Sequence, residues 1–165
     1  MCNTHINKDT LRASTSQRYT FRSGNMSQFK CPSSVMLAGP SQCGKTTFTR
    51  QLLQNADILF ERPIRKIVYC YGQLQECFNS MGSQITFVEG IPEDIPSLFP
   101  VSCRPGVLVL DDLIRNCSAD ERVLDLFTKV SHHCHVTCIY LTQNLFPPGK
   151  FSRSISFKRT LHYRF

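Results

Sequence analysis

The sequence predicts an α/β fold in which helices cover both faces of a mainly parallel β-sheet. Short, continuously apolar runs, which are typical of strands buried on both faces, alternate along the chain with amphipathic segments of helical period. Three of these runs end on a glycine, an acid or an amide, at the strand ends where ligands bind in such sheets. At 165 residues, the chain is expected to form one domain with a substantial core.

The strands and helices follow from these patterns. Strands are expected over 33–39, 65–72, 106–112 and 135–144, with a short further strand over 84–90. A helix is expected over 46–60, with an apolar face made by Phe48, Leu52, Leu53, Ala56 and Leu59 or Phe60. A second helix is expected over 119–133, with Val123, Leu124, Phe127 and Val130 inward. The segment 91–100 contains several prolines and predicts a loop or a short helix.

Basic residues gather at both ends of the chain, which has a formal net charge of +7. Residues 1–30 are polar, basic and without periodicity, and we expect them to form a flexible N-terminal arm. Residues 31–165 are expected to form the folded domain, with a last strand that looks incomplete. Two solvated tails would explain this charge as well as contact with a polyanion such as the DNA backbone would.

The location of the protein in the cell is predicted from a search of the sequence for membrane-spanning and signal segments. No apolar run is long enough to span a membrane, and no apolar segment follows the N-terminus as it does in a signal peptide. Nine cysteines are therefore expected to be reduced thiols. We expect an intracellular protein, in the nucleus or the cytoplasm.

The stretch GPSQCGKTT, residues 39–47, predicts a phosphate-binding loop. It contains the full pattern G-x-x-x-x-G-K-[ST], between an expected strand and an expected helix. Backbone N–H groups and the positive end of the helix would hold the phosphates, Lys45 would reach the β and γ phosphates, and the Thr46 hydroxyl would bind Mg²⁺. We expect ATP and Mg²⁺ to be bound, with the nucleotide held by Gly39, Pro40, Ser41, Gln42, Cys43, Gly44, Lys45, Thr46 and Thr47.

Two acids end the apolar run VLVLDD. An acid at the end of a buried strand is costly unless it is paired or binds a metal. Asp111 is therefore expected to bind Mg²⁺ through water, and Asp112 is placed to orient or deprotonate the attacking water. The alternative for Asp112 is that it caps a following helix.

The stretch YLTQN ends the fourth expected strand at Gln143. In one class of P-loop NTPase, an additional strand lies between the P-loop strand and the acidic strand, and a polar residue at its end senses the γ phosphate. The Gln143 amide can both donate to phosphate and accept from water. Its alternative is a polar strand end without a function. The predicted fold is thus a three-layer P-loop NTPase sandwich of the additional-strand type.

Together, GPSQCGKTTF, IVYCYG, VLVLDDL, LFTKVSHHCHVTCIYLTQNLF and GKFSRSIS resemble the HerA–FtsK superfamily of ATPases. The resemblance covers about residues 35–156 and is closest to viral genome-packaging ATPases of poxvirus type, including those of Polinton/Maverick-like elements. It implies Walker A and Walker B motifs and a homo-oligomeric ring that hydrolyses ATP and moves double-stranded DNA. It also implies capsid proteins as partners and a place in the host cell or the virion.

The same resemblance makes Arg153 a candidate trans-acting arginine, which would stabilise transition-state charge in the neighbouring subunit. An ordinary phosphate-contacting or solvated arginine is the alternative. The end of the chain departs from the family pattern, because relatives continue into another strand where residues 156–165 show only a ragged alternation. That strand should pair beside the P-loop strand, and a shortened one would leave a bare edge and put the ring in doubt.

Two other functions and one other site stay open. A nucleotide-binding remnant without turnover would fit the shortened end, whereas a small-molecule kinase would need lid arginines that residues 78–96 lack. The run SHHCHVTC, residues 131–138, carries zinc-type side chains. A strand would hold Cys134 and Cys138 more than ~12 Å apart, too far for one ion, so we favour Cys138 as a core residue.

Overall fold

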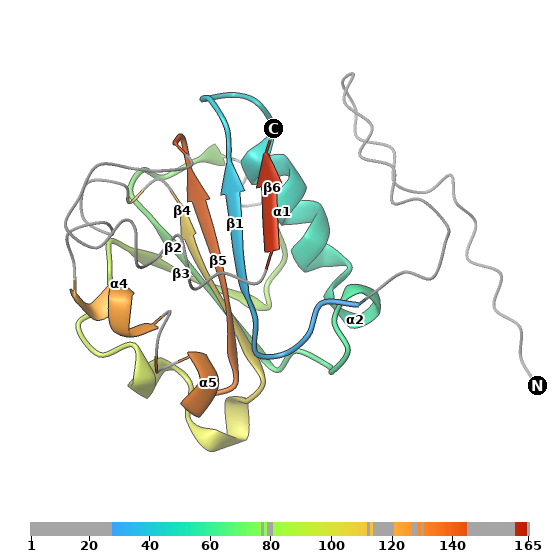
Figure 1. Cartoon of the computed structure of the whole chain (residues 1–165), viewed down its shortest axis with the longest axis vertical. Coiled ribbons are helices and arrows are strands. Elements are labelled where there is room, and N and C mark those ends of the chain that lie inside the picture. Colours follow the sequence, from blue (N-terminus) through green and yellow to red (C-terminus); the bar gives the residue numbers. More distant parts are fainter. Residues whose placement is uncertain are drawn as a thin grey trace, which may run out of the picture.

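The computed structural model describes residues 28–76, 78, 81–111, 113, 121–126, 129, 131–144 and 161–164. Its centre is a six-stranded sheet in the order β3-β2-β4-β5-β1-β6, in which every neighbouring pair is parallel (Figure 1). The strands are β1 (Ser34–Ala38), β2 (Lys66–Tyr71), β3 (Ile85–Glu89), β4 (Gly106–Asp111), β5 (Val136–Thr142) and β6 (Leu161–Arg164). The predicted α/β class and parallel sheet are confirmed.

The strand order confirms the additional-strand prediction. β5 lies between β1, which leads into the phosphate-binding loop, and β4, which ends in Asp111. All residues of β1, β4 and β5 are buried, as their continuous apolar sequences require. β6 pairs with the outer side of β1, from Val35↔Leu161 to Ala38↔Arg164. The ragged run at the end of the sequence therefore contains a four-residue strand beside the P-loop strand.

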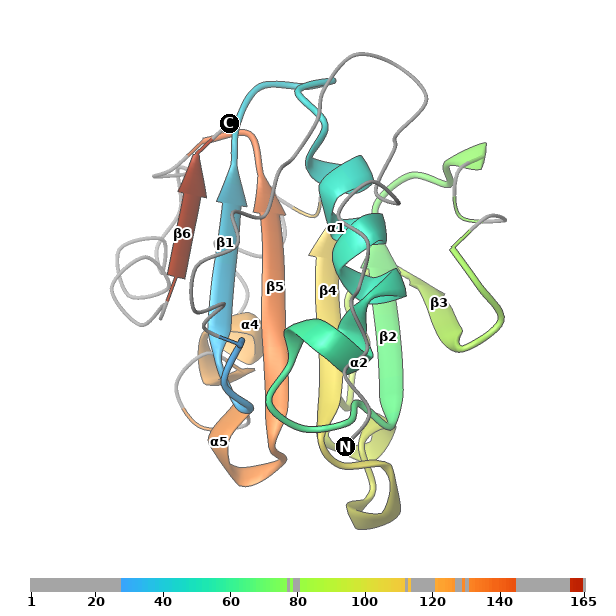
Figure 2. The same cartoon turned by 90° about the vertical axis from the view of Figure 1, so that its right-hand side faces the viewer.

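One face of the sheet is covered by α1 (Lys45–Gln54) and α2 (Ala56–Leu59), as Figure 2 shows. We expected one helix here, and the structure divides it at Asn55, which has φ −111° and ψ 24°. The Asn55 side chain donates to the carbonyl of Gln51 at 2.7 Å, a local hydrogen bond that competes with helix continuation. The predicted apolar face is buried, and it includes both Leu59 and Phe60.

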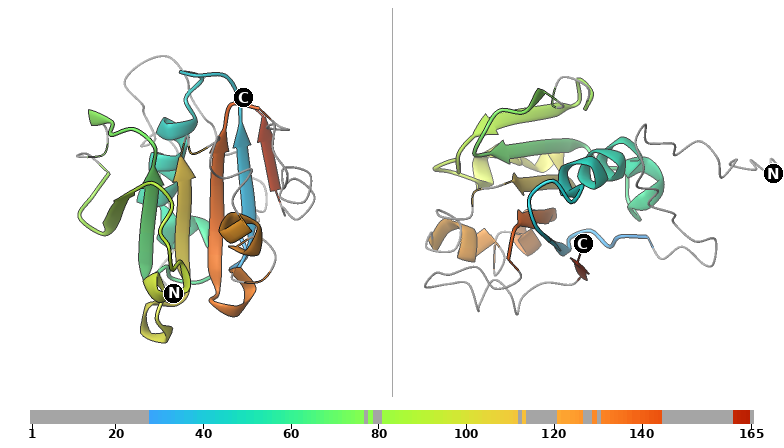
Figure 3. Two further views of the ribbon diagram at one scale, coloured as in Figure 1. Left: turned by 90° about the vertical axis from the view of Figure 1, so that its left-hand side faces the viewer. Right: turned by 90° about the horizontal axis from the view of Figure 1, so that it is seen from above.

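The opposite face carries shorter elements (Figure 3): η2 (Pro96–Leu98), η3 (Val101–Cys103), α4 (Glu121–Asp125) and α5 (Ser131–His133). The segment predicted as one helix over 119–133 is described only as α4 and α5 with the residues next to them. Val123 is buried and Leu124 is partly buried, as predicted, whereas Phe127 and Val130 lie outside the described residues.

Two apolar cores result, one on each side of the sheet. The core under α1 and α2 contains Val35, Leu37, Phe48, Leu52 and Tyr69. The core on the other face is formed mainly by alternate residues of the same strands, among them Met36, Val68, Leu108 and Leu110. This alternation of side chains across a two-sided sheet fixes which strand-end residues reach the α1 face.

The core includes one residue that we assigned to the N-terminal arm. Phe29 is 7% exposed, its N–H donates to the Leu59 carbonyl at 2.7 Å, and its ring lies 5.4 Å from that of Phe60. The rest of the predicted arm, residues 1–27, lies outside the described residues. No helix in the described part of the chain is long and apolar enough to cross a membrane.

Candidate nucleotide-binding site

The phosphate-binding loop leaves β1 at the carboxyl edge of the sheet and turns directly into α1. The Gly39 N–H donates to the carbonyl of Thr142 at 3.1 Å, which anchors the start of the loop to the end of β5. Gly44 has φ 95°, a left-handed conformation that favours glycine, and its carbonyl accepts the first bond of α1, from Phe48 at 2.8 Å. The helix therefore begins at the loop, with its positive N-terminus at this edge.

Lys45, the first residue of α1, folds back over the loop. Its Nζ donates to the carbonyl oxygens of Gly39 at 2.7 Å and Pro40 at 2.8 Å, and it lies 3.8 Å from the Cys43 Sγ. The ammonium is thus held over the concave side of the loop by two carbonyls. A bound phosphate oxygen is a stronger partner for this charge than a neutral carbonyl.

Thr46 and Asp111 come from α1 and from β4, and their side chains meet. The Thr46 Oγ1 lies 3.4 Å from the Asp111 Oδ2. Mg²⁺ prefers oxygen ligands at 2.0–2.1 Å in an octahedron, in which adjacent ligand oxygens are about 3 Å apart. One hydroxyl and one carboxylate at this separation therefore fit a magnesium site, and the donor set supports the predicted pair of metal ligands.

Tyr69 of β2 is a member of this site that the sequence analysis missed. Its hydroxyl donates to the Asp111 Oδ2 at 2.6 Å, the length of a charge-assisted O–H···O⁻ bond. Both side chains are buried, with Tyr69 at 0% and Asp111 at 4% exposure. The phenol therefore compensates for the burial of the carboxylate and holds its orientation toward Thr46.

A cavity of about 490 Å³ opens above these groups. It is lined by residues of the phosphate-binding loop and the first turn of α1, by Asp111, and by residues 141–143 at the end of β5. Gln73 and Gln75, from the connection after β2, complete the lining. Lys45 and Asp111 are the charged side chains among the described lining residues, so this cavity combines a cation that can hold a phosphate with an anion that can hold a metal ion.

Gln73 is held near Asp111 by the backbone. The Gly72 N–H donates to the Asp111 carbonyl at 3.1 Å, which continues the β2–β4 pairing one residue past the strand end. Gln73 follows at once and lines the cavity. The sequence feature that could have identified Gln73 is its place directly after an expected strand, which is the reasoning that selected Gln143.

The structure brings together most of the predicted site. Gln143 is exposed and lines the cavity, as do the predicted residues Ser41, Gln42, Gly44, Lys45, Thr46, Thr47 and Asp111. Gly39, Pro40 and Cys43 contact Lys45. Asp112 and Arg153 lie outside the described residues, so their roles stay predictions.

The zinc-type side chains of residues 131–138 do not converge in the structure. Cys138 is buried in β5, within the core on the α4 side of the sheet. The Cys134 Sγ accepts a hydrogen bond from Nη2 of Arg104 at 3.5 Å. The partner of this thiol is therefore a cationic side chain of the fold. Among the described residues, no three histidine, cysteine or acidic side chains are placed to hold a metal ion together.

The loop, the inserted strand and the acidic strand end together decide the fold. The chain has the fold of a P-loop NTPase. It is similar to the genome packaging NTPase B204 from Sulfolobus turreted icosahedral virus 2, solved in complex with AMP, with a TM-score of 0.53 and 12% sequence identity over 81% of this chain and 75% of that one. It is also similar to the cytoplasmic domain of EssC, with a TM-score of 0.52 and 12% identity over 81% of this chain and 31% of that one.

At this identity the likeness shows the fold and nothing finer. No family model matches the sequence, and no curated protein matches it. What the site does is therefore inferred from its own residues.

Proposed function

We propose that this chain binds ATP with Mg²⁺, hydrolyses it, and uses the energy to move double-stranded DNA, as translocases of the viral genome-packaging type do. The observation that carries the proposal is the meeting of Thr46 and Asp111 at 3.4 Å beside Lys45, at the edge where β5 separates β1 from β4. That arrangement offers a cation for the phosphates and two oxygens for a metal in one cavity.

Nucleotide binding follows from groups that are already in place. The Lys45 ammonium would exchange the carbonyls of Gly39 and Pro40 for β and γ phosphate oxygens, while loop N–H groups and the α1 N-terminus receive the remaining charge. Thr46 and Asp111 would hold Mg²⁺, which neutralises charge on the same phosphates. Tyr69 acts as a positioning residue, because its hydroxyl holds the Asp111 carboxylate by a hydrogen bond.

Hydrolysis needs a positioned water and a group that responds to the γ phosphate. We assign the positioning of the attacking water to Asp112, directly after Asp111. We assign the sensing of the γ phosphate to Gln143 at the end of β5. Arg153 would complete the site of a neighbouring subunit in a homo-oligomeric ring. Pairing of β6 with β1 supports this assembly, because it covers the edge that a missing strand would leave bare.

Duplex DNA and capsid proteins are proposed as partners because of the sequence resemblance to packaging ATPases. The fold shared with a genome packaging NTPase supports the same class. The net charge of +7 favours a polyanionic partner.

The decisive experiment measures ATP turnover with and without duplex DNA, for the wild type and for Lys45→Ala and Asp112→Asn. We expect turnover that DNA stimulates, most of all at low salt, and none in either variant. Arg50→Ala, on α1 outside the cavity lining, is the control and should behave as the wild type. Nucleotide binding without any wild-type turnover would refute the motor and favour a nucleotide-binding remnant.

Cys43 gives a separate check of the nucleotide position. It is partly exposed in the phosphate-binding loop, whereas Cys70 is 0% exposed in β2. We expect Mg-ATP to protect Cys43 from alkylation, as followed by mass spectrometry, with Cys70 unmodified in every sample. Unchanged labelling of Cys43 in saturating Mg-ATP would contradict the assignment of the loop.

A further inference from the structure

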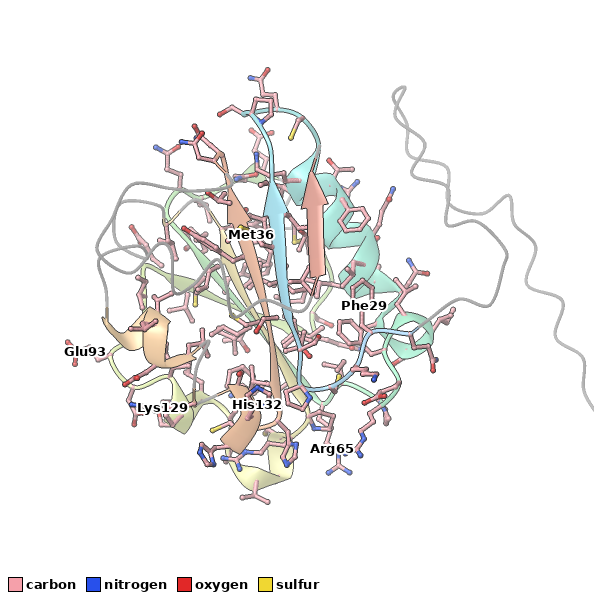
Figure 4. The ribbon with its side chains drawn as sticks, viewed as in Figure 1. Phe29, Met36, Arg65, Glu93, Lys129 and His132 are labelled. Atoms are coloured by element: carbon pink, nitrogen blue, oxygen red, sulfur yellow. The ribbon has the colours of Figure 1, made fainter. Side chains whose placement is uncertain are left out.

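The edge of the sheet opposite the nucleotide site collects basic side chains. The connections that enter β2, β4 and β5 are residues 60–65, 99–105 and 131–135, and they bring three arginines, three histidines and one glutamate to this amino edge. The arginines and histidines are Arg62, Arg65, Arg104, His132, His133 and His135. Figure 4 shows Arg65 and His132 at the same end of the molecule, where nitrogen atoms gather.

Hydrogen bonds join these three connections into one layer. The Arg65 N–H donates to the carbonyl of Pro105 at 2.9 Å, and the Gly106 N–H donates to that of His135 at 3.1 Å. The Arg104 guanidinium donates to the carbonyls of Phe99 at 2.9 Å and His133 at 3.2 Å. The basic residues therefore sit on a continuous support rather than on independent loops.

The arginines of this layer differ in how far their guanidinium groups are already bound within the fold. Arg104 is committed to carbonyls of its own fold, so it supplies charge and ties the connections together. Arg62 and Arg65 are exposed, and within the described residues neither has a carboxylate at ion-pair distance. The nearby acid, Glu61, accepts the Cys31 N–H at 3.0 Å through Oε1. Nη1 of Arg65 also donates to the Ser102 carbonyl at 3.5 Å, a long bond on the exposed surface. Arg62 and Arg65 therefore both keep solvent-facing guanidinium groups that an outside partner could reach.

The described charge at the opposite edge is mixed. Lys45 and Asp111 line the cavity there, and Glu76 follows β2. Among the described connections, those that enter β2, β4 and β5 carry a clear excess of basic side chains over acids. Such an excess would attract an extended polyanion.

We propose that the amino edge, centred on Arg62 and Arg65, binds the phosphate backbone of duplex DNA. The choice of DNA as the polyanion rests on the proposed function, while the charged edge itself does not. Neighbouring strands are about 4.8 Å apart, so β2, β4 and β5 span about 10 Å. This distance matches the rise of about three nucleotides of one DNA strand, at 3.4 Å each.

The contacts are expected to be insensitive to base sequence. Arginine guanidinium groups bind phosphates in a bidentate way, and phosphate contacts carry no base information. Exposed histidines and Lys66 at the start of β2 would add polar and charged contacts along the same line. A backbone-binding edge suits a protein that moves along DNA of any sequence.

The test measures binding of the full chain to labelled duplex DNA by fluorescence anisotropy at several salt concentrations, without nucleotide. In the double variant Arg62→Gln/Arg65→Gln we expect the slope of log K against log salt to fall by about 2, one for each lost phosphate contact. Arg50→Gln removes a positive charge on α1, away from these connections, and should keep the wild-type slope. The melting temperatures of both variants serve to verify folding.

The outcomes separate this inference from the proposed function. Equal slopes for the double variant and the wild type would overturn the amino edge, whatever the ATPase assay gives. A reduced slope without wild-type turnover would keep the edge and remove the motor. If the double variant lost binding to vesicles of anionic phospholipid while its DNA binding stayed unchanged, the edge would be assigned to a membrane surface and the DNA proposal would be overturned. A reduced slope together with loss of DNA-stimulated, but not basal, turnover would support both.

Discussion

The hydroxyl of Tyr69 lies 2.6 Å from Oδ2 of Asp111, and so β2 takes part in the proposed metal site, whose other residues come from α1 and β4. The two residues are on neighbouring strands, with Tyr69 two positions before the residue paired with Asp111. Side chains two apart on a strand share a face, so the long phenol reaches the carboxylate along the α1 side of the sheet.

Replacing Tyr69 with phenylalanine removes this hydrogen bond and keeps the ring. We expect the Mg²⁺ concentration for half-maximal turnover to rise by about 10- to 100-fold, because the carboxylate loses the group that orients it. The protein should also lose about 1.5–3 kcal/mol of stability, as measured by urea unfolding. Tyr71→Phe, two residues along the same strand and outside the cavity lining, is the control. An unchanged Mg²⁺ titration of Tyr69→Phe would argue against the positioning role.

The Thr46 hydroxyl is predicted to act through its oxygen alone. Thr46→Ala should weaken Mg-dependent nucleotide turnover while metal-independent nucleotide binding changes little, because one of the two protein oxygens near the metal is lost. Thr46→Ser keeps the hydroxyl and should restore turnover to near the wild-type value. Steady-state kinetics across a Mg²⁺ series would distinguish these variants, and a serine variant as inactive as the alanine one would contradict a ligand role.

Gln73 is predicted to act on the chemical step. It lines the cavity beside Asp111, so its amide can donate to a developing charge or hold a water there. We expect Gln73→Ala to lower kcat by about 100-fold or more with a smaller change in KM, as removal of a transition-state donor does. Leu74→Ala alters the next residue, which is 77% exposed, and should leave both constants unchanged. An effect on KM alone would make Gln73 a binding residue instead.

Alkaline pH should destabilise the domain through Cys70. Burial raises the pKa of this thiol from 9.0 to about 12, so its protonated form is favoured in the folded state. The resulting stabilisation is complete below pH 9 and is lost as pH rises from 9 to about 12, at about 1.4 kcal/mol per pH unit.

The measurement is urea unfolding over this pH range. Cys70→Ala should be less stable at neutral pH because a buried side chain is shortened, and its stability should fall less steeply above pH 9. Cys103→Ala, at a partly exposed position, should keep the wild-type slope. Burial also raises the pKa of Cys31, which adds to the slope in both variants. Parallel curves for Cys70→Ala and the wild type would show that Cys70 is not the source.

Much of the fold could be predicted because its strands are buried on both faces and carry continuous apolar sequences. The expected ends of the strands at Gly39, Asp111 and Gln143 lie together at one edge, since parallel strands present the same end to the same side. The helix break at Asn55 was not predicted, because it depends on one side-chain bond rather than on apolar period. Phe29 was misplaced because its neighbours are polar, although its own side chain is buried against Phe60.

The part of the site that escaped prediction comes from β2. Tyr69 lies inside an apolar strand and reads as a core aromatic, and its hydrogen bond to Asp111 depends on the pairing of β2 with β4. Gln73 lies in a connection whose distance from the phosphate-binding loop is decided by strand order. Sequence spacing does not contain that order, whereas the loop motif itself is local and was predicted residue by residue.

The position of β1 between β5 and β6 has a consequence for biosynthesis. β1 is made first of the three, yet Val35 pairs with Ile139 and Leu161, each roughly a hundred or more residues later. At about 5–20 residues per second, a ribosome needs on the order of 5 to 20 seconds to add the intervening chain. Through that interval the apolar β1 has neither neighbour and is open to chaperones or to aggregation. The phosphate-binding loop is therefore synthesised early, but the complete site can form only after β5 has left the ribosome.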